Sequence, residues 1–206
     1  IVVEGRADHA GTTPMGRRAD ALAAAARLVT GVEGLATSLA AGPGHFTATV
    51  GEFAIEPNAA NVVPSRARLL IDARAEERGT MEVFAASVEQ LATEIARETG
   101  TVIGPPRRIS DNMPTPGDPL VLDVLDAACA AAGASHRRMA SGAGHDTAFM
   151  AKVTRAAMIF VPCLGGRSHA PEEFAETDDI ALGAAVLLNA VIQLDEKLQD
   201  VIQESV

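Results

Sequence analysis

The sequence predicts an α+β domain followed by a segment of α/β type. In the first half, stretches of strand and helix character follow the order strand, helix, strand, strand, helix, strand, which is the split βαβ pattern. This order predicts a four-stranded antiparallel sheet with both helices on one face, over residues 1–112. The stretch NMPTPGDP has the composition of a linker, and residues 113–206 then predict three helices and one strand.

Hydrophobic periodicity places each element of the first domain. Strands are expected where apolar residues run together or alternate, and helices where they recur at spacings of three and four. Pro105 and Pro106 lack the N–H that a sheet requires, so the last strand is expected at an edge. The expected strands are Ile1–Gly5, 45–53, 67–75 and the region 101–110, and the expected helices are Arg18–Leu39 and Thr80–Glu98.

The second part is expected to hold one strand. Helices are predicted at Leu120–Ala132, Thr147–Lys152 and Asp178–Leu198, and the run AAMIFVPC (156–163) has the composition of a buried strand. Because one strand cannot form a sheet, we expect these residues to complete a sheet supplied by chain outside the 206 residues. The start at Ile1, within a strand-like run and without an initiator Met, likewise predicts a fragment of a longer protein.

The composition argues against several classes of protein. The 206 residues carry 17 basic and 27 acidic side chains, a formal net charge of −10, and the basic residues form no stripe, so a nucleic-acid partner is not expected. No apolar run approaches the roughly 20 residues that a bilayer span requires, so we expect a soluble protein without a membrane partner. Cys129 and Cys163 have no CxxC spacing, which predicts free thiols in a reducing compartment and hence a cytoplasmic location.

Three polar residues of the first domain are candidates for chemistry. His9 stands in the tight turn HAGTTPM between a strand and a helix, and Asn61 lies in the loop EPNAANVVPS. In LLIDARA the period of two puts Arg74 and Asp72 on the face of the sheet that the helices leave open, where a guanidinium fork could hold a carboxylate. The alternatives are a solvated histidine in a surface turn and a plain surface charge.

Two glycine-rich loops of the second part each present one histidine. His145 follows the glycines of SGAGHD, and His169 lies in GGRSHAPEE. Both loops flank the expected strand, at a sheet edge where α/β active sites gather, and a neutral imidazole is the commonest zinc ligand. The alternatives are a capping or core-edge role for His145 and a solvated side chain for His169. His45 and His136 are interpreted as structural or solvated residues.

Five motifs, in their order and spacing, resemble the amidase, hydantoinase and carbamoylase family of dinuclear-metal hydrolases: DHAGTTPMGRRADAL, NVVP, DAR, SGAGHD and VPCLGGRSHAPEE. This family includes N-carbamoyl-L-amino-acid hydrolases, allantoate amidohydrolases and β-ureidopropionases, within the dinuclear zinc aminoacylase and carboxypeptidase superfamily. The resemblance covers essentially the whole chain. It implies a ferredoxin-like lid and dimerisation domain at residues 1–112, followed at 113–206 by the C-terminal part of an α/β zinc-peptidase-like catalytic domain.

The resemblance implies a role for each candidate in the first domain. His9 matches the lid histidine that reaches across the dimer into the partner's active site and stabilises the oxyanion. Asn61 and Arg74 match the lid residues that hold the carboxylate of the substrate. A homodimer through the lid domain is therefore expected.

The second part is expected to contribute to the substrate pocket and to one metal site. By resemblance, Gly144 and His145 lie beside the substrate, and His169 matches the last ligand of a pair of divalent ions, which could be Zn, Mn, Co or Ni. In the family the other ligands come from chain that would precede Ile1. The metal site of these 206 residues is therefore expected to be incomplete.

For the longer parent enzyme the resemblance implies metal-dependent hydrolysis of a ureido or amide C–N bond. The expected substrates are small molecules, N-carbamoyl-L-amino acids or a related ureido acid such as allantoate. The 206-residue chain by itself is expected to be inactive. The alternatives are a noncatalytic dimerisation or ligand-binding module, and a dipeptidase or aminoacylase of the same superfamily.

Overall fold

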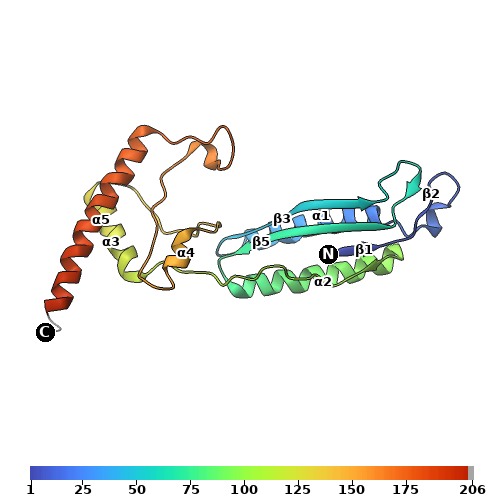
Figure 1. The fold of residues 1–206 in the computed structure, drawn as a ribbon, viewed down its shortest axis with the longest axis horizontal. Helices are drawn as coiled ribbons and strands as arrows, with labels where there is room; N and C mark the ends of the chain where they lie inside the picture. The colour runs from blue at the N-terminus through green and yellow to red at the C-terminus, as the bar shows by residue number, and fades with distance from the viewer. Residues whose placement is uncertain (204–206) are drawn as a thin grey trace. The chain divides into compact units, whose positions relative to one another are not determined.

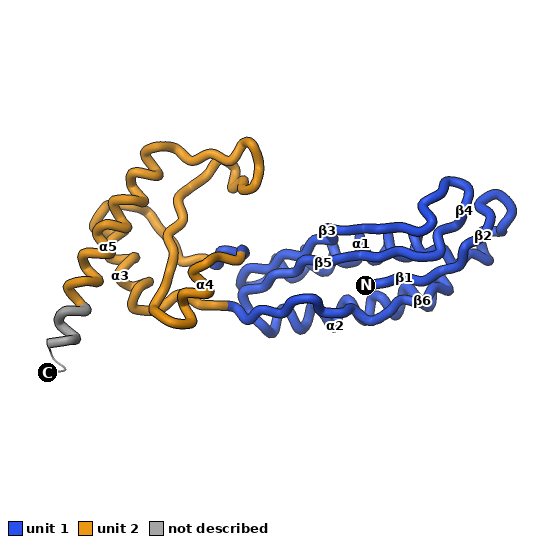
Figure 2. The backbone as a smooth tube through the Cα atoms, viewed as in Figure 1, with its two compact units in different colours: residues 1–114, 140–143 blue, residues 115–139, 144–206 orange. Residues whose placement is uncertain are grey.

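The computed structural model describes the backbone of residues 1–203 and the side chains of residues 1–197. The chain divides into two compact units, coloured separately in Figure 2. Unit 1 consists of residues 1–114 and 140–143, and unit 2 consists of residues 115–139 and the chain from residue 144 onward. Each unit has a hydrophobic core of its own.

Unit 1 is built on a four-stranded antiparallel sheet (Figure 1). The strands lie in the order β3-β5-β1-β6, and β3 (Phe46–Glu56) and β5 (Arg66–Ala75) pair along their whole length. β1 (Val2–Glu4) pairs with β5 on one side and with β6 (Val102–Ile103) on the other. β6 lies at the edge, as predicted, and it is short because a Pro-Pro pair follows it closely.

Two long helices pack on one face of this sheet. α1 (Ala21–Ala40) begins where the side chain of Asp20 accepts a hydrogen bond from the N–H of Ala23, and α2 (Arg78–Thr99) ends at Gly100, whose φ of 66° is the left-handed conformation that glycine favours. Both helices bury apolar residues against the same strands. The shared core comprises Val3, Ala67 and Leu69 from the sheet, with Ala21, Ala24, Ala25, Leu28, Ala92 and Ile95 from the helices.

Successive side chains of β5 point to opposite faces of the sheet, so one face is buried and the other exposed. Leu69 is 2% exposed beneath the helices, and Ile71 and Ala73 pack against the neighbouring core cluster around Phe46. The residues between them, including Asp72 and Arg74, are exposed on the opposite face. The sequence prediction for this strand is therefore confirmed.

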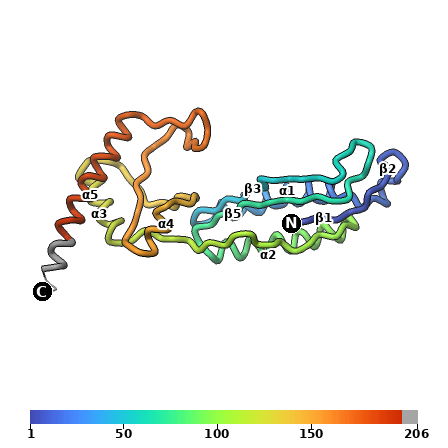
Figure 3. The backbone as a smooth tube through the Cα atoms, in the orientation of Figure 1, coloured from blue at the N-terminus to red at the C-terminus, as the bar shows by residue number. Residues whose placement is uncertain are grey.

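A second, two-stranded sheet forms at the end of unit 1 where β5 begins. β2 (Asp8–His9) pairs antiparallel with β4 (Val62–Val63), although more than 50 residues separate them along the chain. Figure 3 shows the two loops that carry these strands lying together. The sequence did not predict this pairing, because strands of two residues have no detectable periodicity.

Unit 2 consists mainly of helices. They are α3 (Pro119–Ala131), the short α4 (Asp146–Met150) and α5 (Thr177–Gln203), joined by extended chain and one 3-10 turn, η2 (Leu164–Gly166). α3 and α5 pack together through a small core of Val124, Ala128, Val186 and Ala190.

The run AAMIFVPC forms no strand among the described residues, and its expected pairing with chain outside the 206 residues stays a prediction. Residues 156–163 form no ladder, because the described part of unit 2 offers no second strand to pair with them. The side chains of Ala156 to Ile159 are half-buried, and Ile159 packs against the core between α3 and α5. The apolar composition of the run therefore agrees with the partial burial of residues 156–159, whereas strand pairing depends on a partner strand.

Two helical stretches are long and apolar enough to cross a membrane by length and composition. They are α1 and the part of α5 from Thr177 to Lys197. A core helix meets the same criteria, and α1 buries six residues, among them Leu28 and Val32, against unit 1. α5 packs one face on α3. The expected lack of a membrane partner stays a prediction.

Candidate functional site

His9 is exposed at the start of a hydrogen-bonded turn. The backbone N–H of Gly11 donates to His9 Nδ1 over 3.0 Å, and the N–H of Thr13 donates to the carbonyl of His9 over 3.1 Å. The short strand β2 fixes the chain before the turn, and η1 (Met15–Arg17) follows it. His9 is therefore held by its own turn, with the Nε2 side of its ring left unengaged by the described hydrogen bonds.

Arg18 holds the inside of the same turn. Its Nε donates to the carbonyl of Thr13 over 3.0 Å, and its Nη2 donates to the carbonyls of Ala10 over 2.6 Å and Thr13 over 2.9 Å. The sequence predicted only that Arg18 begins a helix, with no role in the turn. The signal that could have identified it is its place directly after a turn whose carbonyls need donors.

Asn61 lies beside His9. The N–H of Ala10 donates to the carbonyl of Asn61 over 2.9 Å, and His9 pairs with Val62 in the small sheet. The structure therefore brings together two of the three predicted residues of unit 1, through strands too short to be predicted.

Arg74 lies at the other end of β5. The eight residue steps from Arg66, where the strand leaves the His9 turn, to Arg74 span about 26 Å of extended strand. Figure 1 shows the small sheet of β2 and β4 at one end of unit 1, and the far ends of β3 and β5 at the other. Within one chain, Arg74 is not part of the same site as His9 and Asn61.

The guanidinium of Arg74 is held by Asp72, its neighbour on the open face. Arg74 Nε and Nη2 donate to the two carboxylate oxygens of Asp72 over 3.0 and 2.8 Å. This hydrogen-bonded pair lowers the pKa of Asp72 and raises the pKa of Arg74. Arg74 Nη1 donates to the carbonyl of Gly142 over 3.1 Å. Three of its five N–H groups are thus used, and one remains on each terminal nitrogen.

The segment 140–143, which contributes to unit 1, lies against this end of the sheet. Gly142 has a φ of 68°, and a Cβ built there would lie 2.4 Å from His45 Nε2. A side chain at residue 142 would therefore collide with the imidazole of His45, which was expected to be a structural or solvated residue. Arg74 and His45 together hold the first glycine of the SGAGHD motif.

In unit 2, His145 is the N-cap residue of α4 and packs on Phe160, with ring centroids 5.7 Å apart. Its Nε2 is buried and has no hydrogen-bond partner in the described part of the chain. Buried polar atoms in folded proteins nearly always have a hydrogen-bond partner, so an unpaired imidazole nitrogen needs an explanation. A Cβ at the preceding Gly144 would meet no atom within 4 Å, so this glycine is not required by crowding.

His169 is exposed and has a φ of 57°, which is unusual for a residue with a side chain. Its N–H donates to Glu173 Oε2 over 2.9 Å, which stabilises the bend. Among the residues described, no three His, Cys, Asp or Glu side chains gather to hold a metal ion. A pair of divalent ions therefore does not fit the groups that the described residues present, and His169 has no further candidate ligand gathered beside it there.

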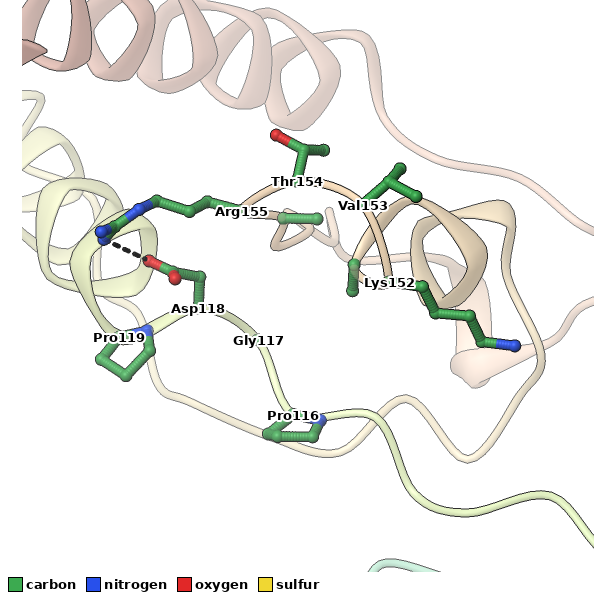
Figure 4. A pocket seen from close by; sticks show the side chains of 10 residues that line it. Pro116, Gly117, Asp118, Pro119, Lys152, Val153, Thr154 and Arg155 are labelled. Atoms are coloured by element: carbon green, nitrogen blue, oxygen red, sulfur yellow. Dashed lines mark ion pairs between the residues drawn. The ribbon is translucent and has the colours of Figure 1, made fainter.

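An open hollow of about 490 Å³ also lies in unit 2 (Figure 4). It is lined by residues 116–119 and 151–156, and Arg155 pairs across it with Asp118 over 3.6 Å. None of the residues predicted for the site lines it. We assign it no role.

Two family profiles match the chain. The profile described as "Peptidase dimerisation domain" covers residues 1–100, and the one described as "Peptidase family M20/M25/M40" covers residues 85–193. The first covers both helices of unit 1 and every strand of its sheet except β6. The second begins within α2 and includes most of unit 2.

Named relatives extend the comparison. The chain is 36% identical to an N-carbamoyl-L-amino-acid amidohydrolase of Paenarthrobacter aurescens, covering 95% of the chain and 46% of the relative. It is 33% identical to the allantoate amidohydrolase of Bacillus subtilis, covering 94% of the chain and 46% of the relative. The chain thus spans about half the length of the curated relatives that it matches.

A solved structure agrees with these matches. An amidase of the hydantoinase/carbamoylase family from Burkholderia multivorans superposes with a TM-score of 0.83 at 35% identity, over 92% of this chain and 45% of that chain. The resemblance expected from the five sequence motifs is confirmed. With a family profile matched over more than half of its residues, the chain belongs to peptidase family M20/M25/M40.

Proposed function

We propose that this chain is part of a metal-dependent amidohydrolase that cleaves the ureido or amide C–N bond of an N-carbamoyl-L-amino acid or a related ureido acid such as allantoate. The observation that carries the proposal is the turn that holds His9 beside Asn61, in a chain similar to an N-carbamoyl-L-amino-acid amidohydrolase and an allantoate amidohydrolase. In this reaction the imidazole of His9 would stabilise the negative charge that develops on the attacked carbonyl oxygen.

Unit 1 would serve as a ferredoxin-like lid that also forms a homodimer, corresponding to residues 1–112, with 113–206 as the C-terminal part of the catalytic domain. The strand order β3-β5-β1-β6 and the match to a dimerisation domain support this assignment. A molecule the size of an amino acid cannot bridge the length of β5 between the His9 turn and Arg74. In a two-fold dimer, His9 and Asn61 of one subunit would act with Arg74 of the other.

Arg74 suits a carboxylate ligand. Asp72 occupies one edge of its guanidinium and fixes the plane of the group, while one N–H on each terminal nitrogen remains for two carboxylate oxygens. Asn61 of the partner would contribute an amide donor to the same carboxylate. Gly144 and His145 would line the substrate pocket, and the buried, unpartnered Nε2 of His145 supports a role toward a group that this chain does not supply.

The reaction class needs divalent metal, and the described residues do not by themselves form a site for it. We propose that His169 is one ligand of a pair of Zn, Mn, Co or Ni ions, and that the remaining ligands lie outside these 206 residues. The two cysteines are free thiols, which supports a cytoplasmic location.

The test compares the 206-residue chain with a polypeptide extended upstream to the length of its relatives. The extended protein should hydrolyse N-carbamoyl-L-amino acids or allantoate when loaded with Zn or Mn, and the 206-residue chain should neither turn these over nor bind two ions per molecule. Activity of the extended protein on dipeptides or N-acyl amino acids only would support the dipeptidase or aminoacylase alternative.

The noncatalytic alternative is favoured by one observation, the match of residues 1–100 to a dimerisation domain. A chain that dimerises but remains inactive at every length would support it. Sedimentation of the 206-residue chain should show a dimer at micromolar concentration.

A further inference from the structure

We propose that Gly11 and Arg18 are positioning residues that present His9 as a neutral N–H donor through Nε2. The role of that donor in catalysis rests on the proposed function, whereas the protonation pattern of the ring does not. Both residues act on the same turn, Gly11 through its backbone and Arg18 through its side chain.

The bond from Gly11 determines which nitrogen of His9 carries the proton. A backbone N–H can only donate, so Nδ1 must offer its lone pair to the N–H of Gly11, 3.0 Å away. In the neutral ring the one proton then resides on Nε2, on the side away from the turn. This tautomer directs an N–H outward, which is the requirement for a donor to a developing oxyanion.

Arg18 makes the turn rigid. Its fork bonds the carbonyls of Ala10 and Thr13, which are three residues apart and flank Gly11, with three hydrogen bonds of 2.6 to 3.0 Å. A lysine has one nitrogen on a flexible stem and cannot supply the same planar fork. The neighbouring Arg17 offers a comparison, because its side chain makes no hydrogen bond or ion pair in the described chain. Its backbone N–H donates to the carbonyl of Pro14 over 3.0 Å, and its carbonyl accepts from Arg6 over 2.7 Å.

Gly11 is also close to the ring that it binds. A Cβ built on Gly11 would lie 3.2 Å from His9 Cε1 and 3.5 Å from Nδ1, so a side chain there would move the imidazole or lengthen the hydrogen bond. Gly16, in the same segment, would place a Cβ in open space. The pair Gly11→Ala and Gly16→Ala therefore separates contact with His9 from a general effect of replacing glycine.

His136 provides an opposite pattern within the same protein. Its Nδ1 lies 3.1 Å from the carbonyl of Ala134, which can only accept, so Nδ1 of His136 carries a proton. Its Nε2 lies 3.4 Å from Asp126 Oδ1. One long-range ¹H–¹⁵N spectrum of the 206-residue chain should therefore show His9 with an unprotonated Nδ1 and His136 with a protonated Nδ1.

The experiment records that spectrum at a pH of roughly 8.5, about two units above the ordinary pKa of histidine. His9→Gln assigns the His9 signals. In the wild-type chain His9 should show one tautomer, and in Arg18→Met or Gly11→Ala its two nitrogen shifts should move toward the average of both tautomers. Arg17→Met and Gly16→Ala should leave them unchanged. A protonated Nδ1 in the wild type, or shifts that neither Arg18→Met nor Gly11→Ala alters, would overturn the proposal.

Kinetics of the extended protein then test the consequence for catalysis. Arg18→Met should lower kcat by about 10- to 100-fold with little change in KM, because misplacing a catalytic group by about 1 Å costs up to about 100-fold. Arg18→Lys should not restore kcat, since it retains the charge without the fork. Failure of the extended protein to hydrolyse any ureido substrate would refute the proposed function, while the spectrum would still decide the state of His9.

Discussion

The backbone N–H of Ala10 donates to the carbonyl of Asn61 across 2.9 Å, joining two loops that are about 50 residues apart in the chain. This bond and the adjacent β2–β4 pairing place His9 and Asn61 at one end of unit 1, while β5 carries Arg74 to the other. The two ends of unit 1 can therefore be tested separately, by substitutions that affect one end alone.

Mixed dimers of the extended protein should distinguish the two ends. If His9 of one subunit acts with Arg74 of the other, a dimer of His9→Ala and Arg74→Ala subunits has one site with both residues intact. Its activity should be about half that of the wild type, whereas each homodimer should be impaired. This can be measured on heterodimers purified through two different affinity tags.

A matched mixture controls this experiment. His9 and Asn61 lie at the same end, so a dimer of His9→Ala and Asn61→Ala subunits leaves every site with one defect, and no recovery is expected. Recovery in this mixture, or none in verified dimers of His9→Ala with Arg74→Ala, would show that the residues are not divided between subunits as proposed.

His9→Ala should mainly lower kcat. The imidazole is expected to interact with charge that develops during attack, so its removal should reduce kcat by roughly 10²–10³ with little effect on substrate binding. Steady-state kinetics of the extended protein measure this. A normal kcat in His9→Ala would instead support the alternative that His9 is a solvated residue of a surface turn.

Arg74→Ala should mainly raise KM. The carboxylate of the substrate is present in both the ground state and the transition state, and loss of a charged hydrogen bond costs about 1.5–3 kcal/mol, or about 10- to 100-fold in KM. Arg68→Ala is the control, because Arg68 lies on the same exposed face of β5 and contacts Glu52 at 3.5 Å, away from Gly142. Equal effects of the two substitutions would contradict a specific carboxylate site at Arg74.

Replacing Gly5 should destabilise unit 1. A Cβ at Gly5 would lie 2.2 Å from the carbonyl oxygen of Ala19 and 2.9 Å from the N of Ala21, both backbone atoms that cannot move independently. We expect Gly5→Ala to cost about 1–3 kcal/mol or more in the free energy of unfolding. Gly34→Ala, in open space within α1, should instead stabilise by up to about 1 kcal/mol. Urea denaturation of both variants measures the difference.

The ion pairs of Asp111 should make stability depend on acid pH. Arg78 and Arg108 donate hydrogen bonds to this carboxylate and lower its pKa to about 2, from an ordinary value of about 3.9. A depressed pKa contributes stability that is fully present above the unfolded value and is lost as the pH falls through the folded value. The free energy of unfolding of the wild type should therefore exceed that of Asp111→Asn by its full amount above about pH 4. This difference should shrink as the pH falls toward 2.

Urea midpoints from pH 7 to pH 2 give this comparison directly. Glu33→Gln is a suitable control, because Glu33 is an exposed acid of α1 whose side chain has no hydrogen bond or ion pair in the described chain. If the urea midpoints of wild type and Asp111→Asn differ by the same amount at every pH, the ion pairs of Asp111 do not contribute in the way proposed.

Much of unit 1 could be predicted from the sequence, because its long elements repeat their burial pattern many times. The alternation in β5 identified the covered face correctly. The three-and-four spacing in α2 correctly indicated that Phe84, Val88 and Ile95 are covered, but the same spacing also included Val83, which is 55% exposed. β2 and β4 could not be found in this way, since two residues define no period and their pairing depends on chain brought from a distance. The predicted strand at 156–163 lacks a ladder for the complementary reason, that its partner is not in unit 2.

The candidate site likewise has parts that local sequence predicts and parts that depend on residues distant in the chain. Local motifs identified His9, Asn61 and Arg74, but the distance between His9 and Arg74 depends on the length and direction of β5, which no motif states. Arg18 was missed because its three hydrogen bonds go to two backbone carbonyls of the turn, and the residue types of a turn do not show which of its carbonyls need a donor. The contact of His45 with Gly142 was missed because it joins residues almost 100 positions apart.

The long β3–β5 ladder also limits how this protein can change in length during evolution. Inserting one residue within β5 would turn Arg74 toward the helices and Ala73 outward, whereas inserting two would keep both faces and move Arg74 by about 7 Å. The ladder already carries one irregularity, between Val50 and Glu52 of β3, where Gly51 is left without a partner in the register. Insertions and deletions among homologous β5 strands should therefore occur in even numbers, and odd differences should be confined to the bulge in β3.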